Sequence, residues 1–355
     1  MTKTTRVMLA VLAVCGTSAA LAQSSVTLYG RINTSVEHQK LGNASATGLV
    51  SSGSYLGFKG TEDLGNGLKA GFVLEGTVEA DTGGTGYSFD RQSELNLSGN
   101  FGMLRLGSFD PYSYTVTADA ISMHNHDAGP TGDKLYDGVL WGGNKIAYRT
   151  PTIAGFDAEV QYQFGEKQKD AKLTVPVLGE TIGTHKNGWD LGVNYANGPL
   201  GLGFGYSNLK YSDVVAVSGA QTKFSQFALR ASYEIGDLTL GAYYQKQDTK
   251  AANQKAKRDV YRISAKYVIG ASELHANIGQ ASKYKVNGAK TGNSATQWTL
   301  AYNYNLSKRT KVYALYSNLS HTESAGINFS GTFNMTPTND SDKFRTFGVG
   351  IRHFF

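Results

Sequence analysis

The side chains best suited to chemistry are the seven histidines, and only two of them lie close together in the chain. His124 and His126 occur in the segment MHNHDAG, directly before Asp127. Two histidines at i and i+2 beside a carboxylate could hold a metal ion, but a pair of this kind in a loop is more often simply polar. Hydrolysis would also need a nucleophile or activated water beside a histidine and a carboxylate. The remaining histidines are scattered, so the sequence favours no enzyme.

One glycine-rich segment, GLGFG at 201–205, is superficially similar to a phosphate-binding loop. Leu202 and Phe204 alternate with the glycines, as they would on a strand. No helix pattern follows, and no Lys-Ser/Thr pair ends the segment, as a phosphate loop would require. We therefore interpret GLGFG as part of a strand and expect no bound cofactor.

The first residues have the pattern of a cleaved secretion signal. Lys3 and Arg6 precede an apolar run at 7–22, which ends in the small-x-small sequence ALA that a signal peptidase cuts. The run is too short for a membrane-spanning helix. We predict a signal peptide at 1–22 and a single domain at 23–355.

The composition favours many strands and tight turns, with 43 Gly, 21 Tyr and 16 Phe but only 6 Pro. After the signal, no stretch approaches the roughly 18 consecutive apolar residues of a membrane helix. The net charge of +6 is too mild and too evenly spread to indicate a nucleic-acid partner. The single cysteine, Cys15, lies in the signal, where Val14 before it makes lipidation unfavourable. The mature chain therefore has no disulfide.

The periodicity separates a membrane barrel from a soluble sheet. In FDAEVQYQF (156–164), apolar residues alternate with Asp, Glu and Gln, and the same alternation recurs at 68–75, 238–245 and 346–355. Charges and amides in the middle of the polar faces indicate water along the whole strand. Aromatic residues at strand ends, such as Tyr162, are typical of the girdles where a barrel meets the lipid interfaces. A soluble sandwich would show no paired girdles.

The connections alternate between short and long. The short ones are 62–69, 98–103, 150–156, 196–201, 234–238, 269–273 and 305–310. The longer polar stretches are 39–50, 81–87, 110–142, 166–186, 212–221, 250–256, 284–293 and 321–341. Seven tight turns and eight longer loops connect sixteen strands. The sequence therefore predicts an all-β fold, a transmembrane antiparallel β-barrel.

Several segments carry a family resemblance that extends over essentially the whole mature chain. They are SSVTLYGRINTSVE (24–37), SYLGFKGTEDLGNGLKAGFVLEG (54–76), RQSELNLSGNFGMLRLGSFD (91–110), YRTPTIAGFDAEVQYQFGE (148–166), YNLSKRTKVYALYS (304–317) and VGIRHFF (349–355). Together they resemble the general diffusion porins of Gram-negative outer membranes. The resemblance implies a homotrimer of sixteen-stranded barrels that passes ions and small hydrophilic solutes, surrounded by outer-membrane lipid and lipopolysaccharide. It also implies that the third outer loop folds into the lumen, and that Phe355 is the cue to the barrel-assembly machinery.

The loop at 110–142 is the longest connection and is strongly acidic. Its carboxylates are Asp110, Asp119, Asp127, Asp133 and Asp137, against the single base Lys134. From the residues alone, a solvated acidic surface loop is the simpler interpretation. The resemblance instead implies that this loop narrows the lumen, with Asp119, Asp127 and Asp133 at the constriction.

Strand parity predicts a basic wall opposite this loop. Arg31 is out of phase with Leu28 and Ile32, whose side chains face lipid, so Arg31 points inward. The same counting turns inward Lys59, Lys69, Arg105, Lys145, Arg149, Arg230, Arg262 and Arg352, together with the acids Glu75, Glu94, Asp157 and Glu159. A basic wall facing an acidic loop would produce a transverse field that orients dipolar solutes.

Two positions depart from the family pattern and reduce the expected selectivity. Relatives usually carry an arginine where this chain has Tyr55, and an arginine at the end of the constricting loop is missing near Leu140. We expect Lys145 and Arg149 to compensate from the next strand. The expected constriction sets Arg31, Lys59, Arg105, Lys145 and Arg149 against Glu94, Asp119, Asp127 and Asp133, which predicts modest anion preference or near-neutrality. The function expected is passive diffusion through a water-filled channel; a channel selective for small anions and an outer-membrane barrel enzyme are the alternatives.

Overall fold

The computed structural model describes residues 25–84, 86–121, 135–136, 142–165, 173–175, 180–182, 186–212, 221–251, 254–292, 294–320, 333 and 342–355. The predicted signal peptide therefore lies outside the described residues. Strands make up most of the described chain. They are β1 (Ser25–Leu41), β2 (Ala44–Ser51), β3 (Tyr55–Gly65), β4 (Leu68–Thr77), β5 (Gln92–Gly99), β6 (Gly102–Ser108), β7 (Lys145–Arg149), β8 (Phe156–Gln163), β9 (Leu173–Val175), β10 (Glu180–Ile182), β11 (Lys186–Asn197), β12 (Leu200–Ser212), β13 (Gln221–Ile235), β14 (Leu238–Ala251), β15 (Gln254–Ile269), β16 (Ser272–Ala281), β17 (Tyr284–Val286), β18 (Ala289–Thr291), β19 (Ala295–Asn305), β20 (Thr310–Leu319) and β21 (Phe344–Phe354). The short helical elements α2 (Tyr112–Tyr114) and η1 (Thr115–Asp119) follow β6.

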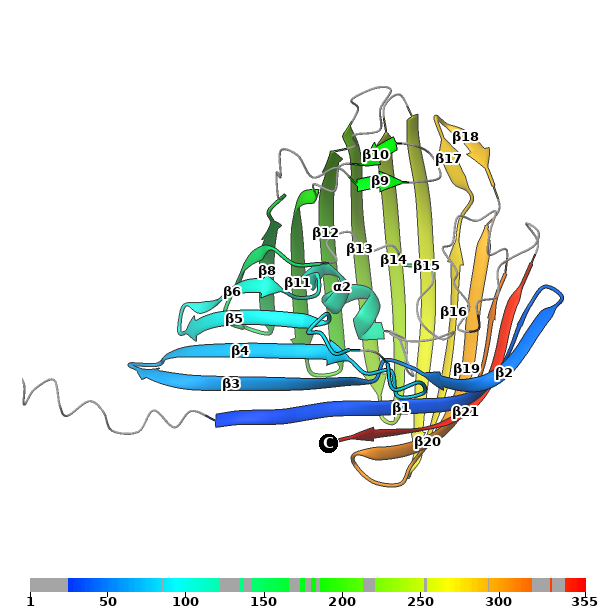
Figure 1. The fold of residues 1–355 in the computed structure, drawn as a ribbon, viewed down its shortest axis with the longest axis horizontal. Coiled ribbons are helices and arrows are strands. Elements are labelled where there is room, and N and C mark those ends of the chain that lie inside the picture. Colours follow the sequence, from blue (N-terminus) through cyan, green and yellow to red (C-terminus); the bar gives the residue numbers. More distant parts are fainter. Residues whose placement is uncertain are drawn as a thin grey trace, which may run out of the picture.

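The strands form one antiparallel sheet that closes on itself (Figure 1). Neighbours in the sequence pair with each other, and β1 closes the ring by pairing with β21 from Arg31 opposite Phe354 to Leu41 opposite Phe344. Nineteen strands of the described chain belong to this sheet. Because β2 leads into β3 after a short break, and β17 and β18 form a hairpin at the rim, sixteen strands of the described chain build the wall. The predicted sixteen-stranded antiparallel barrel is confirmed.

The two faces of the wall are inverted relative to a water-soluble protein. On β1, Ile32 and Val36 point outward and are 37% and 49% exposed, whereas Asn33, Ser35 and Glu37 point inward and are at most 1% exposed. Apolar side chains normally occupy the interior, and polar ones the surface. An exposed apolar face opposite a polar interior is the arrangement of a barrel surrounded by lipid. No helix in the described part of the chain is long and apolar enough to cross a membrane.

The seven predicted short connections are turns between consecutive strands. In the first of them, Asn66 and Gly67 both have positive φ, at 53° and 80°, the conformation that a tight two-residue turn requires. Glycine adopts this conformation at no steric cost, and asparagine tolerates it better than most residues.

Three of the stretches predicted as long loops are hairpins instead. β1 continues to Leu41 and β2 begins at Ala44, β14 continues to Ala251 and β15 begins at Gln254, and β17 and β18 lie within 284–293. These extensions lie beyond the apolar band, where both faces of the sheet meet water. Hydrogen bonding continues there, but the apolar alternation that predicts a strand is lost.

Candidate functional site

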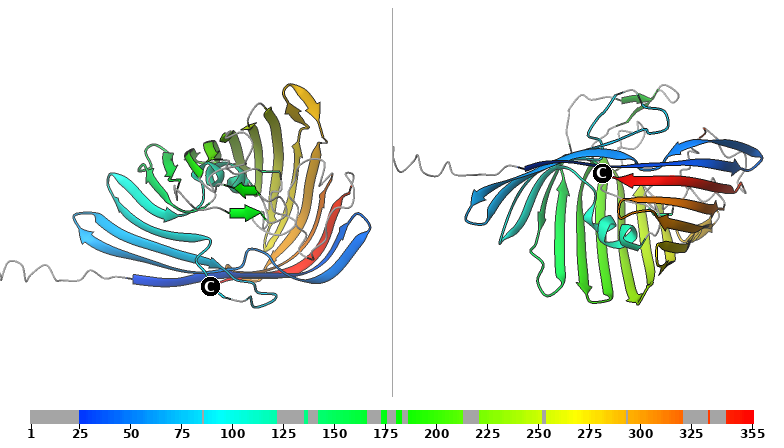
Figure 2. Two further views of the ribbon diagram at one scale, coloured as in Figure 1. Left: turned by 45° about the horizontal axis from the view of Figure 1, so that its top comes forward. Right: turned by 90° about the horizontal axis from the view of Figure 1, so that it is seen from below.

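The segment that follows β6 turns into the barrel. α2 and η1 pack against the inner faces of β11, β12 and β13, inside the wall of strands (Figure 2). Ser113, Thr117 and Ala118 are almost completely covered there. The described start of the long loop therefore occupies part of the cross-section of the lumen.

Two glycines on the inner face of β12 make room for this segment. A Cβ atom added to Gly205 would lie 2.7 Å from the Cβ of Ser113, and one added to Gly203 would collide with the carbonyl oxygen of Val116. Real Cβ atoms do not approach other atoms so closely. Because these glycines have no side chain, the helical backbone lies directly on the wall.

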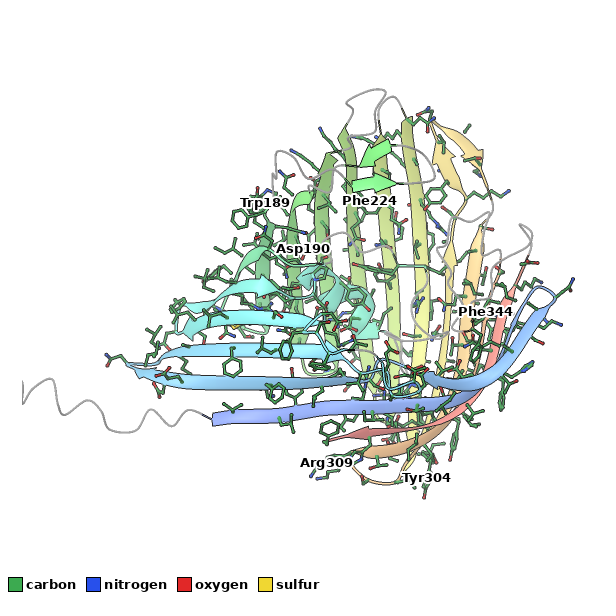
Figure 3. The ribbon with its side chains drawn as sticks, viewed as in Figure 1. Trp189, Asp190, Phe224, Tyr304, Arg309 and Phe344 are labelled. Carbon is green, nitrogen blue, oxygen red and sulfur yellow. The ribbon has the colours of Figure 1, made fainter. Side chains whose placement is uncertain are left out.

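Asp190 of β11 holds the same segment by hydrogen bonds. Its carboxylate accepts a hydrogen bond of 2.9 Å from the backbone N–H of Ser113, one from the Ser113 hydroxyl, and one of 2.6 Å from the Ser207 hydroxyl of β12. Asp190 is fully buried, whereas the adjacent Trp189 is 55% exposed on the outer face (Figure 3). A fully buried carboxylate with three donors is a strong anchor for the loop.

Further contacts fix the two ends of this segment. The Tyr112 hydroxyl donates to Asp157 of β8, and the Arg149 guanidinium lies 4.2 Å from the centre of the Tyr112 ring. Burial raises the pKa of Tyr112, and the hydrogen bond to Asp157 raises it further, so the phenol keeps its proton. At the other end, the Ser264 hydroxyl donates to the Ile121 carbonyl over 2.7 Å.

Arg105 lies at the centre of a compact ion-pair network. Its guanidinium contacts Glu94 at 2.5 Å and Glu159 at 2.9 Å, and Glu159 also accepts from Arg149 at 2.7 Å. All of these groups lie on the inner faces of β5 to β8. The positive charges of the two arginines balance the negative charges of the two carboxylates, so this part of the wall is close to neutral.

Lys145 ties the base of the loop to the wall. Its ammonium donates to the Phe109 carbonyl over 2.7 Å, and the residue is only 3% exposed. Burial raises the pKa of neighbouring Asp110 in the loop, while the positive charges of Arg91 and Lys145 act in the opposite direction.

A tyrosine of β3 lies between an arginine of β1 and the arginine that precedes β5. The guanidinium carbons of Arg31 and Arg91 lie 5.2 Å and 5.0 Å from the centre of the Tyr55 ring. Arg31 also donates to the Gly53 carbonyl, over 2.8 Å from Nε. These distances are those of cation–π contacts, which hold both guanidinium groups against the ring.

The acidic partner in this cluster is Glu75. It accepts 2.6 Å from Arg91 and 2.9 Å from the hydroxyl of Tyr29, whose ring lies 5.1 Å from the ammonium of Lys59. The basic cluster, defined as Arg31, Lys59 and Arg91 with Tyr29, Tyr55 and Glu75, therefore contains three cations and one carboxylate.

A polar cavity of about 650 Å³ lies in the lumen near the short-turn ends of the strands. Its ionisable lining residues are Arg230, Glu234, Lys266, Glu273, His275 and Lys311. Glu273 accepts hydrogen bonds from Asn305 at 2.7 Å and Lys311 at 3.0 Å, so its charge is compensated. No group of three or more His, Cys, Asp or Glu suited to a metal occurs in the described part of the chain.

A model of the Gram-negative porin family matches residues 8–324. The chain belongs to this family. The porin is 36% identical to outer membrane porin protein 32 of Delftia acidovorans over 99% of this chain and all of that protein. It is 30% identical to the major outer membrane protein P.IB of Neisseria meningitidis, covering 94% of this chain and 95% of that one.

The solved structures agree with the sequence comparison. An anion-selective porin from Comamonas acidovorans superposes with a TM-score of 0.72 at 31% identity, over 94% of this chain and all of that one. The protein is therefore a porin of the Gram-negative outer membrane, whose strands enclose a water-filled channel for the passive diffusion of ions and small hydrophilic solutes.

The structure distributes the predicted site residues of this porin over separate groups. Arg31 and Lys59 lie in the basic cluster, whereas Arg105 and Arg149 are paired with carboxylates, Glu94 among them. Asp119 ends η1 and is partly exposed. Of the remaining residues, Asp127, Asp133 and the candidate metal ligands His124 and His126 lie outside the described residues.

Sequence reasoning missed three contributors to the porin lumen. Arg91 precedes β5 and lies outside any alternating pattern, so parity could not place it. Asp190 is inward by the same parity as Glu159, but no pattern in the chain indicates that it contacts the loop. Gly203 and Gly205 were visible as a glycine-rich segment, and small residues inside a strand are a signal of close backbone approach.

Proposed function

We propose that this porin passes small anions slightly more readily than cations, because positive charge exceeds negative charge at one section of its wall. The observation that carries the proposal is the basic cluster, in which Arg31 and Arg91 flank Tyr55. Tyr55 stands where relatives usually carry an arginine, and Arg91 supplies a positive charge beside it. The preference is modest because the pairs of Arg105 and Arg149 with carboxylates leave the neighbouring wall neutral.

The position of the cluster gives it influence over permeating ions. Low-dielectric walls focus the field of charges inside a narrow channel, whereas charges on outer loops are screened within about 8–10 Å. Guanidinium groups are also weakly hydrated, so they exchange water for a passing anion readily. A related solved structure described as an anion-selective porin supports this direction of preference.

Replacing Arg31 with alanine is expected to move the reversal potential towards cations. One charge removed at about 10 Å from the ion path changes the energy of a monovalent ion by ~0.4 kcal/mol in water, with opposite sign for anion and cation, so the anion-to-cation permeability ratio falls roughly fourfold. Planar-bilayer recording in a salt gradient measures this shift, which should grow at low salt. The control is Lys308→Ala, which removes a cation from an exposed turn. Equal reversal potentials for the wild type and Arg31→Ala would exclude Arg31 from the selective section.

We further propose that the porin assembles as a homotrimer, with the barrel-assembly machinery inserting it among outer-membrane lipid. Outward-facing small residues such as Ala231 and Ala242 permit close packing of neighbouring barrels. Electrophoresis in SDS without heating should show a trimer that dissociates on boiling. A monomer at every detergent concentration would contradict the trimer while leaving the pore intact.

A further inference from the structure

The polar cavity at the short-turn ends of the strands contains ionised groups that the pore wall does not neutralise. The turns after β11, β13 and β15 border it and lie at the lower ends of these strands in Figure 1. Three basic and two acidic side chains line the cavity, which gives a net charge of +1 with histidine neutral. Glu273 and Lys311 form an ion pair of 3.0 Å, so they compensate each other. The remaining ionised side chains are Arg230, Glu234 and Lys266.

Arg230 of β13 is held in place without a direct carboxylate partner. Its Nη2 donates to the Leu202 carbonyl over 2.9 Å and to the side-chain oxygen of Asn194 over 3.2 Å. The Asn194 amide donates in turn to Asp157 over 3.0 Å, so it separates the guanidinium from that carboxylate. The other terminal nitrogen, Nη1, donates to no group in the described part of the chain. Nη1 is therefore available to a solute in the cavity.

Glu234 of β13 and Lys266 of β15 face the same cavity from one row across the sheet. Thr239 of β14 lies between them, directly opposite Glu234 on one side and Lys266 on the other. Two strand spacings therefore separate their backbones, about 10 Å. Glu234 is exposed and Lys266 is partly buried, and neither side chain forms a hydrogen bond or an ion pair with any residue that the structure describes. The two opposite charges lie near each other without neutralising each other.

The guanidinium of Arg230 lies farther from Lys266, on the other side of the cavity. A Cβ atom added to Gly201 would be 3.2 Å from Nη2 of Arg230, so the guanidinium lies over β12. From β12 to β15 there are three strand spacings of about 4.8 Å, or ~14 Å. The long Lys266 side chain covers part of this distance. The gap that remains suits a solute with an acid group at each end.

We propose that this cavity binds acidic amino acids, of which glutamate is the probe, as they pass through the pore. The α-ammonium group binds Glu234, the α-carboxylate binds Lys266, and the side-chain carboxylate reaches Nη1 of Arg230. Two carboxylates and one ammonium thus meet two cations and one carboxylate, and the net charge of the solute is opposite to that of the cavity. The inference goes beyond the proposed anion preference, because it concerns another section of the pore and a solute with both charges.

Other small solutes match the cavity less well. A dicarboxylate without an ammonium group places an anion beside Glu234, and a neutral amino acid leaves Arg230 without a partner. Binding in a channel must also be weak enough for the solute to leave. Ion pairs at positions open to water are weak, so the exposure of Glu234 suits passage and not retention.

Block of the chloride current in planar bilayers measures this binding. L-Glutamate is added on the side of the short turns, and the concentration that halves the current reports the affinity. Glutarate lacks the ammonium group of glutamate, and L-glutamine lacks its second carboxylate. For the wild type, we expect L-glutamate to block at concentrations about fivefold lower than either, the effect of one exposed ion pair.

Two variants remove the proposed partners from the protein. Glu234→Gln should weaken the block by L-glutamate about fivefold and abolish its advantage over glutarate. Its matched control is Asp237→Asn, which removes an exposed carboxylate from the following turn, outside the cavity lining. Lys266→Gln should also weaken the block about fivefold, whereas Lys308→Gln, in another exposed turn, should not. Because the Glu234 and Lys266 side chains have no partner in the described structure, both variants should fold.

Equal block of the wild type by L-glutamate and glutarate would overturn the proposal, as would an unchanged block in either Glu234→Gln or Lys266→Gln. Arg31→Ala separates this site from the basic cluster, because it should leave the block by L-glutamate unchanged. If Arg31→Ala weakens the block, the solute binds at the basic cluster and the proposal is overturned. The reversal potential of Arg31→Ala in chloride alone tests the anion preference, so the two proposals can fail independently.

Discussion

Replacing Asp190 with alanine is expected to release the start of the inner loop from the wall and to raise the single-channel conductance. The Asp190 carboxylate receives the backbone N–H and the hydroxyl of Ser113 together with the hydroxyl of Ser207. Each buried donor left without an acceptor costs about 1–3 kcal/mol. The Ser113 and Ser207 hydroxyls can still form a hydrogen bond to each other over 2.9 Å. The Ser113 N–H is left without its acceptor, so it accounts for most of the cost in free energy. A loop that leaves the wall to recover water widens the channel on average.

Asp190→Asn is the matched control for this prediction. The amide oxygen keeps an acceptor for the Ser113 N–H, and the amide nitrogen can donate to a serine hydroxyl, so the loop should stay attached. The conductance should then rise, and the unfolding temperature should fall, in the order wild type, Asp190→Asn, Asp190→Ala. If asparagine behaves like alanine, the negative charge itself is essential rather than the acceptor. Wild-type conductance in Asp190→Ala would show that the loop is held elsewhere.

The wall of this barrel was predictable because two solvents act on it. Lipid outside and water inside impose a strict period of two on every membrane-crossing strand, and a single substitution in that pattern would cost free energy. The alternation in FDAEVQYQF, for example, places Glu159 inside and Val160 outside, and the structure agrees: Glu159 is buried and Val160 is 40% exposed. The pattern stops where the lipid stops. For this reason the hairpin ends near Leu41 and Ala251 were predicted as loops.

The lumen was less predictable because its chemistry depends on neighbours that parity does not specify. Parity turned Arg105 and Glu94 inward, but it required the register of β5 and β6 to show that they touch. An arginine whose charge is not balanced by a carboxylate favours anions in a pore, whereas an arginine paired with a carboxylate has little effect on selectivity. Arg31 and Arg105 look alike in the sequence, and only their surroundings separate a basic cluster from a neutral network.

The glycines of β12 are a feature that the sequence shows but whose role it does not reveal. GLGFG was correctly interpreted as a strand and not as a phosphate loop. The absence of side chains at Gly203 and Gly205 serves a contact with Val116 and Ser113, residues that lie some ninety positions earlier in the chain. The glycines signal that some backbone approaches the strand closely, but over such a separation the sequence does not show which segment it is, and only the fold identifies the loop.

Deleting Phe355 is expected to lower the amount of assembled porin in cells roughly tenfold, the effect of raising a barrier by about 1.4 kcal/mol. Phe355 completes the seam between the two ends of the chain: its N–H donates to the Gly30 carbonyl over 3.1 Å, and its own carbonyl accepts from the Gly30 N–H over 3.2 Å. Two such bonds contribute about 0.5–1.5 kcal/mol each. The ring lies against Gly30, where an added Cβ would be 2.5 Å from it.

Loss of the seam and loss of a recognition cue can be separated with a second variant. Gly30→Ala places a Cβ 2.5 Å from the Phe355 ring and 2.6 Å from the Tyr55 carbonyl oxygen, so it strains the seam and the adjoining pairing with β3, but it leaves the terminal aromatic residue in place. If the assembly machinery recognises Phe355, Gly30→Ala should reach near-normal surface levels while the deletion does not. In detergent refolding without the machinery, both variants should close, because β1 and β21 remain paired from Arg31 opposite Phe354 to Leu41 opposite Phe344. Equal losses in cells and in detergent would assign Phe355 to closure alone, and normal surface levels of the truncated protein would refute both roles.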